Sequence, residues 1–144
     1  MNQARQPKRA AASKCPALDR ARDLYDRRAW ADAYQAFLRA EQETVLTAED
    51  IELLALSACM TGRGQDYLHA LERAYHAYDD AGQPLRAVRC AFWLGFHLLM
   101  RDEMGRASGW LARAQRLLDR NGRECAERGY LLLPVVEQRL GSGD

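Results

Sequence analysis

The chain repeats itself at a step of 37 residues, and this repetition restricts the possible folds more than any other feature of the sequence. Small residues recur at the step in three sets, which are Ala21, Ala58 and Gly95; Ala33, Ala70 and Ala107; and Ala40, Ala77 and Ala114. Periods of roughly 20 to 50 residues are typical of folds that stack one supersecondary unit on the next. The 144 residues have room for three such units and part of a fourth.

Apolar residues recur at helical spacing in seven segments, which short breaks containing Gly, Pro or Asn separate. Ala, Leu, Arg and Glu dominate the composition and β-branched residues are few, as helices prefer. The sequence therefore predicts an all-α fold. We expect helices near 17–28, 31–43, 48–61, 65–81, 85–101, 103–120 and 123–140.

Local signals mark several of the expected helix ends. Thr47 stands three residues before Asp50, which is a variant of the capping box. Gly82 and Gly122 suit left-handed C-terminal caps, and Pro84 suits the first turn of a helix.

The recurring small residues explain how the expected helices pair. A small residue in the first helix of each pair allows the second helix to approach at its own small residue, as Gly95 and Ala107 would in the third pair. The next pair then covers the apolar face that is left over. We expect a leader at 1–16 and a repeat domain at 17–144, with units near 17–46, 48–83 and 85–121 and a partial unit at 123–144.

The segment 94–114 (LGFHLLMRDEMGRASGWLARA) has a Leu-Gly pair followed by Ala107, Leu111 and Ala114, and this spacing resembles the tetratricopeptide repeat. The segments 17–40 and 54–77 match less well because they lack the Leu-Gly pair. The 37-residue step is also longer than the family's usual period of about 34 residues. The resemblance implies a right-handed stack of antiparallel helix pairs, about seven helices as three pairs plus one, whose first helices line a concave groove.

Two stretches, at 21–37 and 89–134, are similar to the N-terminal repeat region of large bacterial LuxR-type transcriptional regulators. That resemblance implies a regulatory sensor or an interaction module. These regulators carry their DNA-reading helix-turn-helix at the far C-terminus, and this sequence has no such domain after the repeats.

The charges are distributed unevenly between the leader and the remaining chain. The formal net charge is +1, but the leader carries Arg5, Lys8, Arg9 and Lys14 without any acid, which leaves the body at −3. A protein that holds phosphates needs a clustered positive surface, so we expect no direct nucleic-acid binding by the body. A disordered, solvated leader is the expected state of these residues. A direct DNA-binding regulator that works through the basic leader is the alternative.

The sequence has no pattern that indicates a membrane span, a disulfide framework or a metal site. The leader lacks the apolar centre of a signal peptide, and no later stretch approaches ~18 uninterrupted apolar residues. The four cysteines, at 15, 59, 90 and 125, have no CxxC spacing. His69 and His76 could share a helix face, but a metal site needs further ligands. We expect a cytoplasmic protein without a metal or a cofactor.

No arrangement of residues indicates an enzyme. GxSxG, HExxH and GxxxxGK[ST] patterns are absent from the sequence, and Gly62-Arg63-Gly64 follows a predicted helix instead of the strand that a phosphate-binding loop requires. We therefore expect a noncatalytic module without catalytic residues.

The tetratricopeptide resemblance also suggests which residues line the groove. A protein or peptide partner, or a small effector, would bind there, and aromatic and Arg side chains would anchor it. For the aromatic residues of this set, core packing is the alternative. The candidate groove residues are Arg22, Tyr25, Cys59, Arg63, Arg89, Phe92 and Phe96.

The last expected helix has no following helix to cover it. Its apolar flank, Leu131, Leu132, Leu133, Val135 and Val136, would remain exposed, whereas a repeat stack normally buries such a flank. Either the chain is part of a longer regulator, or Leu131, Leu132, Val135 and Val136 form a self-association surface that gives a homodimer or a scaffold.

Overall fold

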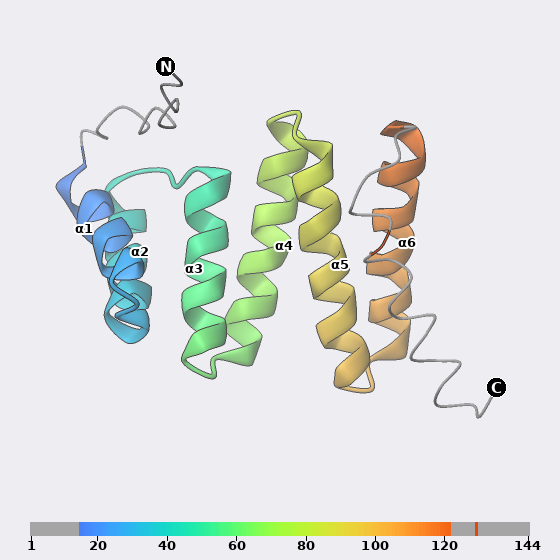
Figure 1. Ribbon diagram of the computed structural model, residues 1–144, viewed down its shortest axis with the longest axis horizontal. Helices are drawn as coiled ribbons and strands as arrows, with labels where there is room; N and C mark the ends of the chain where they lie inside the picture. The colour runs from blue at the N-terminus through green and yellow to red at the C-terminus, as the bar shows by residue number, and fades with distance from the viewer. Residues whose placement is uncertain (1–14, 122–128, 130–144) are drawn as a thin grey trace, which may run out of the picture.

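The computed structural model of the chain describes residues 15–121 and residue 129. This part of the protein is all-α and consists of six helices that stand side by side in chain order (Figure 1). The helices are α1 (Pro16–Asp26), α2 (Trp30–Glu43), α3 (Ala48–Met60), α4 (Gly64–Asp80), α5 (Pro84–Met100) and α6 (Met104–Asn121).

Each described helix packs against the one that follows it, and α1 also packs against α3. The most extensive packing is between α5 and α6 and between α3 and α4, and α4 packs against α5 as extensively as α1 packs against α2. The expected seventh helix at 123–140 lies outside the described residues, and so do the candidate self-association residues Leu131, Leu132, Val135 and Val136. Most of the expected leader, 1–16, lies outside them as well.

Side-chain contacts also join helices that are not consecutive. Among the odd-numbered helices, Arg22 of α1 bonds to Asp50 of α3. Among the even-numbered helices, the hydroxyl of Tyr34 on α2 donates to Asp66 of α4 at 3.0 Å. The rings of Tyr75 on α4 and Trp110 on α6 meet edge to face, with centroids 5.1 Å apart. Every second helix is thus in contact through its side chains.

Four of the five loops between the described helices share one conformation. Three of these loops close the pairs α1–α2, α3–α4 and α5–α6, and the fourth joins α4 to α5. Each has a left-handed residue, which is Arg28 (φ 59°), Gly62 (φ 74°), Gly82 (φ 70°) or Asp102 (φ 59°). The amide of the next residue donates to the carbonyl five residues earlier, from Ala29 to Leu24, from Arg63 to Ala58, from Gln83 to Tyr78 and from Glu103 to Leu98. This is the pattern of a Schellman-type helix end, which satisfies carbonyls that the helix leaves open.

The loops that close the three pairs do not recur at a uniform step. Arg28 and Gly62 are 34 residues apart, whereas Gly62 and Asp102 are 40 residues apart. The difference arises because α4 and α5 have 17 residues each, while α2 has 14 and α3 has 13. Three additional residues are nearly one helical turn of about 3.6 residues, so the recurring alanines keep to the buried face although the loop has moved. The uniform 37-residue step therefore does not hold at the loops.

Gly95 brings α5 and α6 into close contact. A Cβ atom at Gly95 would lie 2.8 Å from Cγ of Leu111 and 3.3 Å from the carbonyl oxygen of Ala107. Real Cβ atoms essentially never come within 3.0 Å of another atom, so any side chain at position 95 would force Leu111 to move. The contact between Gly95 and Ala107 expected from the sequence is present in the third pair.

The expected helix ends agree with the structure wherever it describes them. Thr47 and Asp50 form a reciprocal capping box at the start of α3. Gly82 is left-handed, with φ 70°, after α4, and Pro84 lies in the first turn of α5. Gly122 lies outside the described residues.

Candidate partner-binding surface

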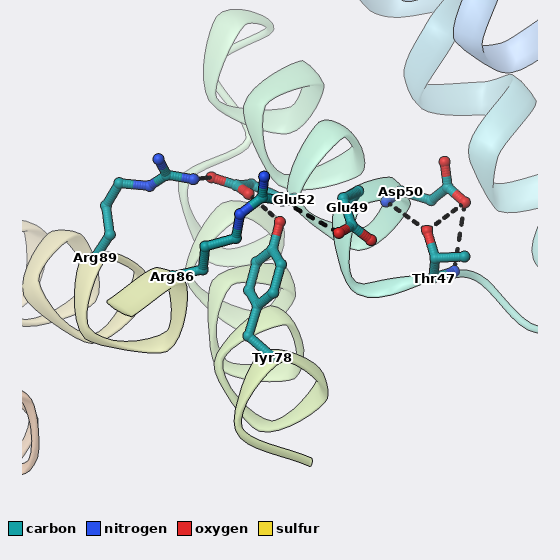
Figure 2. Close-up of polar contacts among 7 residues, drawn as sticks. All are labelled: Thr47, Glu49, Asp50, Glu52, Tyr78, Arg86 and Arg89. Atoms are coloured by element: carbon teal, nitrogen blue, oxygen red, sulfur yellow. Dashed lines mark hydrogen bonds and ion pairs between the residues drawn. The ribbon is translucent and has the colours of Figure 1, made fainter. Parts of the chain in front are cut away.

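Two ion pairs connect α3 to α5 and align the exposed sides of these helices. Arg86 donates to Glu49 at 3.1 Å, and Arg89 donates to Glu52 at 2.9 Å (Figure 2). In both pairs the two residues are 37 positions apart in the sequence. Along this surface, residues separated by that distance therefore lie side by side.

A buried tyrosine lies beneath these ion pairs. Tyr78 of α4 has no exposed surface, and its hydroxyl donates to Glu52. The guanidinium of Arg86 lies 5.6 Å from the centre of the Tyr78 ring. Figure 2 shows the Tyr78 ring extending from α4 toward the carboxylate of Glu52. Burial, followed by the neighbouring Glu52, raises the pKa of Tyr78, so the phenol stays protonated and acts as a donor.

Arg22 makes the corresponding connection from α1 to α3. Its Nε and Nη2 atoms donate to the two carboxylate oxygens of Asp50, at 2.8 and 2.9 Å. Asp50 is only 1% exposed. Burial opposes ionisation of this carboxyl, but hydrogen bonds from Arg22 and Thr47 outweigh that effect, and the pKa of Asp50 is lowered. The capping box of α3 is therefore also the anchor for α1.

These contacts change how two of the candidate groove residues are understood. Arg22 and Arg89 do lie on the side of the odd-numbered helices, but each guanidinium is already bonded to a carboxylate of α3. An anchor that is neutralised within its own chain gains little from a partner's carboxylate. Their observed contacts hold neighbouring helices together.

Beyond the ion pairs, the same surface becomes apolar. One turn after Glu52, Leu56 is 38% exposed, and one turn later Met60 is 58% exposed. On α5, Trp93 follows Arg89 by one turn and is half-buried, and Met100 is 63% exposed. By the 37-residue step of these ion pairs, Leu56 on α3 corresponds to Trp93 on α5. We call Leu56, Met60, Trp93 and Met100 the apolar face.

His97 supports the α5 side of the apolar face. Its Nδ1 donates to the carbonyl oxygen of Trp93 at 2.9 Å. Its ring meets the ring of Tyr67 on α4 edge to face, with centroids 4.7 Å apart. The His97 ring is thereby held between α4 and the side chains of the apolar face.

The other candidate groove residues are in varied positions. The ring of Tyr25 meets Trp30 edge to face at 5.2 Å, and Cys59 is exposed near the end of α3. Arg63 stacks 4.7 Å above the ring of Tyr34 on α2, away from the odd-numbered helices. The rings of Phe92 and Phe96 are stacked at 5.9 Å, but Phe92 is 1% exposed, and only Phe96 of these two is partly accessible.

The apolar face was not predicted from the sequence, because an apolar residue in a helical pattern is usually core. The ion pairs of Glu49 and Glu52 were not predicted either. A signal for them exists in the sequence, because Glu49 and Arg86, like Glu52 and Arg89, are opposite charges at the 37-residue step. Opposite charges at corresponding positions of successive repeats can pair, because each repeat contacts its neighbours.

Among residues 15–121, no three His, Cys, Asp or Glu residues are grouped so that they could hold a metal ion. None of the six helices is both long and apolar enough to cross a bilayer. Cys90 is buried, and burial raises the pKa of its thiol to about 12, which removes it as a nucleophile at neutral pH.

No protein-family model matches the chain, and no curated protein matches it significantly.

Proposed function

We propose that the protein is a noncatalytic interaction module that holds an apolar or amphipathic helix of a partner protein against the apolar face. The observation that carries this proposal is the exposure of Leu56, Met60 and Met100 on α3 and α5, the two helices that the Glu49–Arg86 and Glu52–Arg89 ion pairs connect. Single exposed apolar residues are ordinary on a protein surface, whereas several together indicate an interaction site.

The chemistry of these side chains supports that kind of partner. Methionine is flexible and polarisable, so Met60 and Met100 can adapt to apolar side chains of different shapes. Trp93 supplies a large ring of the kind that anchors interfaces. An amphipathic helix laid along the boundary of α3 and α5 would present residues at i, i+3 and i+7 to such a surface.

We also propose that the six helices form a tetratricopeptide-like, right-handed stack. The first loop step of 34 residues, which is near the family's usual period, supports this architecture. The contact of Gly95 with Ala107 and Leu111 supports it as well, because these residues carry the family resemblance. The similarity to regulators of the LuxR type makes the sensor part of a transcriptional regulator the setting that we propose for the module.

The test uses an uncharged amphipathic peptide, with Leu at helical spacing and Gln and Ser elsewhere, carrying a fluorescent label. Anisotropy measures its binding to the full chain and to the variant M60E/M100E. We expect binding to weaken by about tenfold or more, because two carboxylates replace apolar contacts.

The matched control is Val45→Glu, because Val45 is also a large apolar residue and is 91% exposed. It lies in the loop before α3, at the opposite end of that helix from Met60. This variant should bind the peptide as the unchanged chain does. Equal loss in V45E and M60E/M100E, or full binding by M60E/M100E, would refute the apolar face as the binding surface. Circular dichroism verifies that all variants are folded.

A further inference from the structure

A stripe of three arginines runs along α6 on the side that faces α4. Arg113, Arg116 and Arg120 follow one another at i, i+3 and i+7, so they share one face of the helix over about 10 Å. They line a shallow pocket of about 220 Å³ together with Tyr75, Asp79 and Leu117. All three arginine side chains are exposed.

These arginines differ from Arg22, Arg86 and Arg89, each of which is paired with a carboxylate of α3. In contrast, no carboxylate of the described residues lies within ion-pair distance of Arg113, Arg116 or Arg120. The stripe is therefore a cluster of cationic donors that the described part of the chain does not neutralise.

The geometry of the pocket orients part of this stripe. The guanidinium of Arg113 lies 4.8 Å above the ring of Trp110, and a stacked guanidinium keeps its in-plane N–H groups available. All three arginines also act on the hydroxyl of Tyr75. Burial first, then Asp79, raises the pKa of Tyr75, and the three arginines oppose that rise. Three cations and a phenol donor thus converge on one pocket.

The charge around the stripe restricts what can bind there. Residues 15–80 carry seven arginines against thirteen carboxylates, whereas residues 81–121 carry seven arginines against three. On the side of α4, Asp79 lines the same pocket, so a nucleic-acid backbone that extended past the stripe toward α4 would meet a carboxylate. A short acidic segment of a protein, in contrast, does not need to extend past the stripe.

We infer that the stripe of Arg113, Arg116 and Arg120 is a second binding surface, which takes an acidic segment of a partner protein with carboxylates at helical spacing. Arginine forks suit carboxylates because they donate two parallel hydrogen bonds. This surface shares no residue with the apolar face and lies on the even-numbered helices. The inference therefore stands apart from the proposed function.

The experiment uses a labelled Ala-based peptide with Glu at i, i+4 and i+7, together with the same peptide in which Gln replaces Glu. Anisotropy of binding is measured at two salt concentrations for the full chain and for the variant R116A/R120A. We expect this variant to bind the Glu peptide about five- to tenfold more weakly and with a smaller salt dependence. The Gln peptide should bind none of the variants.

The matched control is R20A/R39A, which removes two exposed arginines from α1 and α2 and makes the same change in net charge. Leader residues Arg5, Lys8, Arg9 and Lys14 are present in every variant, so their attraction is common to all. Equal weakening in R20A/R39A would mean general charge attraction and would overturn the inference. Binding of the Gln peptide at the strength of the Glu peptide would also overturn it.

A single-stranded DNA oligonucleotide with the same net charge as the Glu peptide is the third ligand in this experiment. Tighter binding of this oligonucleotide than of the Glu peptide, with the same dependence on Arg116 and Arg120, would overturn the assignment to an acidic protein segment. The uncharged amphipathic peptide should bind R116A/R120A normally. Failure of the apolar-face proposal and failure of this one are therefore separate results.

Discussion

Arg89 of α5 and Glu52 of α3 form an ion pair with 2.9 Å between Nη2 and Oε1, and the other oxygen of the same carboxylate accepts the hydroxyl of Tyr78. One carboxylate therefore connects three helices. Tyr78 is fully buried, whereas the side chain of Arg89 is 39% exposed. Loss of the bond to Tyr78 would therefore leave a buried hydroxyl unsatisfied, whereas loss of the bond to Arg89 would leave a guanidinium that water can reach.

We expect Glu52→Ala to lower the free energy of unfolding by about 1 to 3 kcal/mol, because it leaves the buried hydroxyl of Tyr78 without an acceptor. Arg89→Ala should cost less than about 1 kcal/mol, because that guanidinium is partly solvated. Urea denaturation measures both. The double variant E52A/Y78F should recover part of the loss, since it also removes the orphaned hydroxyl. Equal costs for the two single variants, without recovery, would contradict this account.

Gly95 gives a second test of packing. Gly95→Ala should destabilise the protein by about 1 to 3 kcal/mol, because the added methyl group would overlap Leu111. The control is Gly109→Ala, which lies in α6 with nothing within 4 Å of its Cβ position. That change should stabilise the protein by about 0.5 to 1 kcal/mol through helix propensity. Thermal denaturation of both variants decides the matter, and a shift of the same sign in both would argue against the close α5–α6 crossing.

The Arg22–Asp50 contact predicts a dependence of stability on pH. The pKa of Asp50 is lower in the folded protein than in the unfolded chain, so its contribution is present above the unfolded pKa. The contribution is lost as the pH falls from about 4 through the lower folded pKa. The variant D50N should be less stable at neutral pH and should lose less stability on acidification than the unchanged protein. Melting temperatures between neutral and acidic pH measure this, and parallel curves would exclude the assigned role.

The cysteines provide a chemical test of burial. In a variant with Cys15 and Cys125 replaced by Ser, a thiol reagent at pH 8 should label Cys59 rapidly, since Cys59 is exposed. Cys90 is buried with its pKa raised to about 12, so it should react only after denaturant unfolds the chain. Mass spectrometry of the labelled peptides distinguishes the two sites. Fast labelling of Cys90 in the folded protein would contradict the packing of α5.

The helices were predictable because their signals are local. Apolar spacing, Thr47 with Asp50, and Gly82 with Pro84 place every described helix end within two residues of the expected position. The loop positions were not predictable from repetition, because an insertion of about one helical turn keeps the alanines on the buried face. The spacing of the alanines therefore does not reveal the insertion. Sequence periodicity reports the face of a helix better than its length.

The candidate site was harder to predict than the fold. Arg22 and Arg89 were selected for their chemistry, and the structure shows that each already has a carboxylate partner. Leu56, Met60 and Met100 were missed because whether an apolar side chain is buried depends on neighbours from other helices, which one sequence does not reveal. Whether such a side chain is exposed is decided by the packing of all the helices around it.

The additional turn in α4 and in α5 has a practical consequence. It carries the loop that joins these helices, residues 81–83, beyond the end of α3, where Figure 1 shows the loop projecting at the upper edge of the molecule. Ala81 and Gly82 are exposed there, and Gly82 is already left-handed. Exposed loop tips of small residues accept inserted sequence with little effect on the core. An affinity tag or a fluorescent reporter inserted at Ala81 and Gly82 would leave the apolar face untouched, whereas Gln83 borders a pocket that Arg120 also lines.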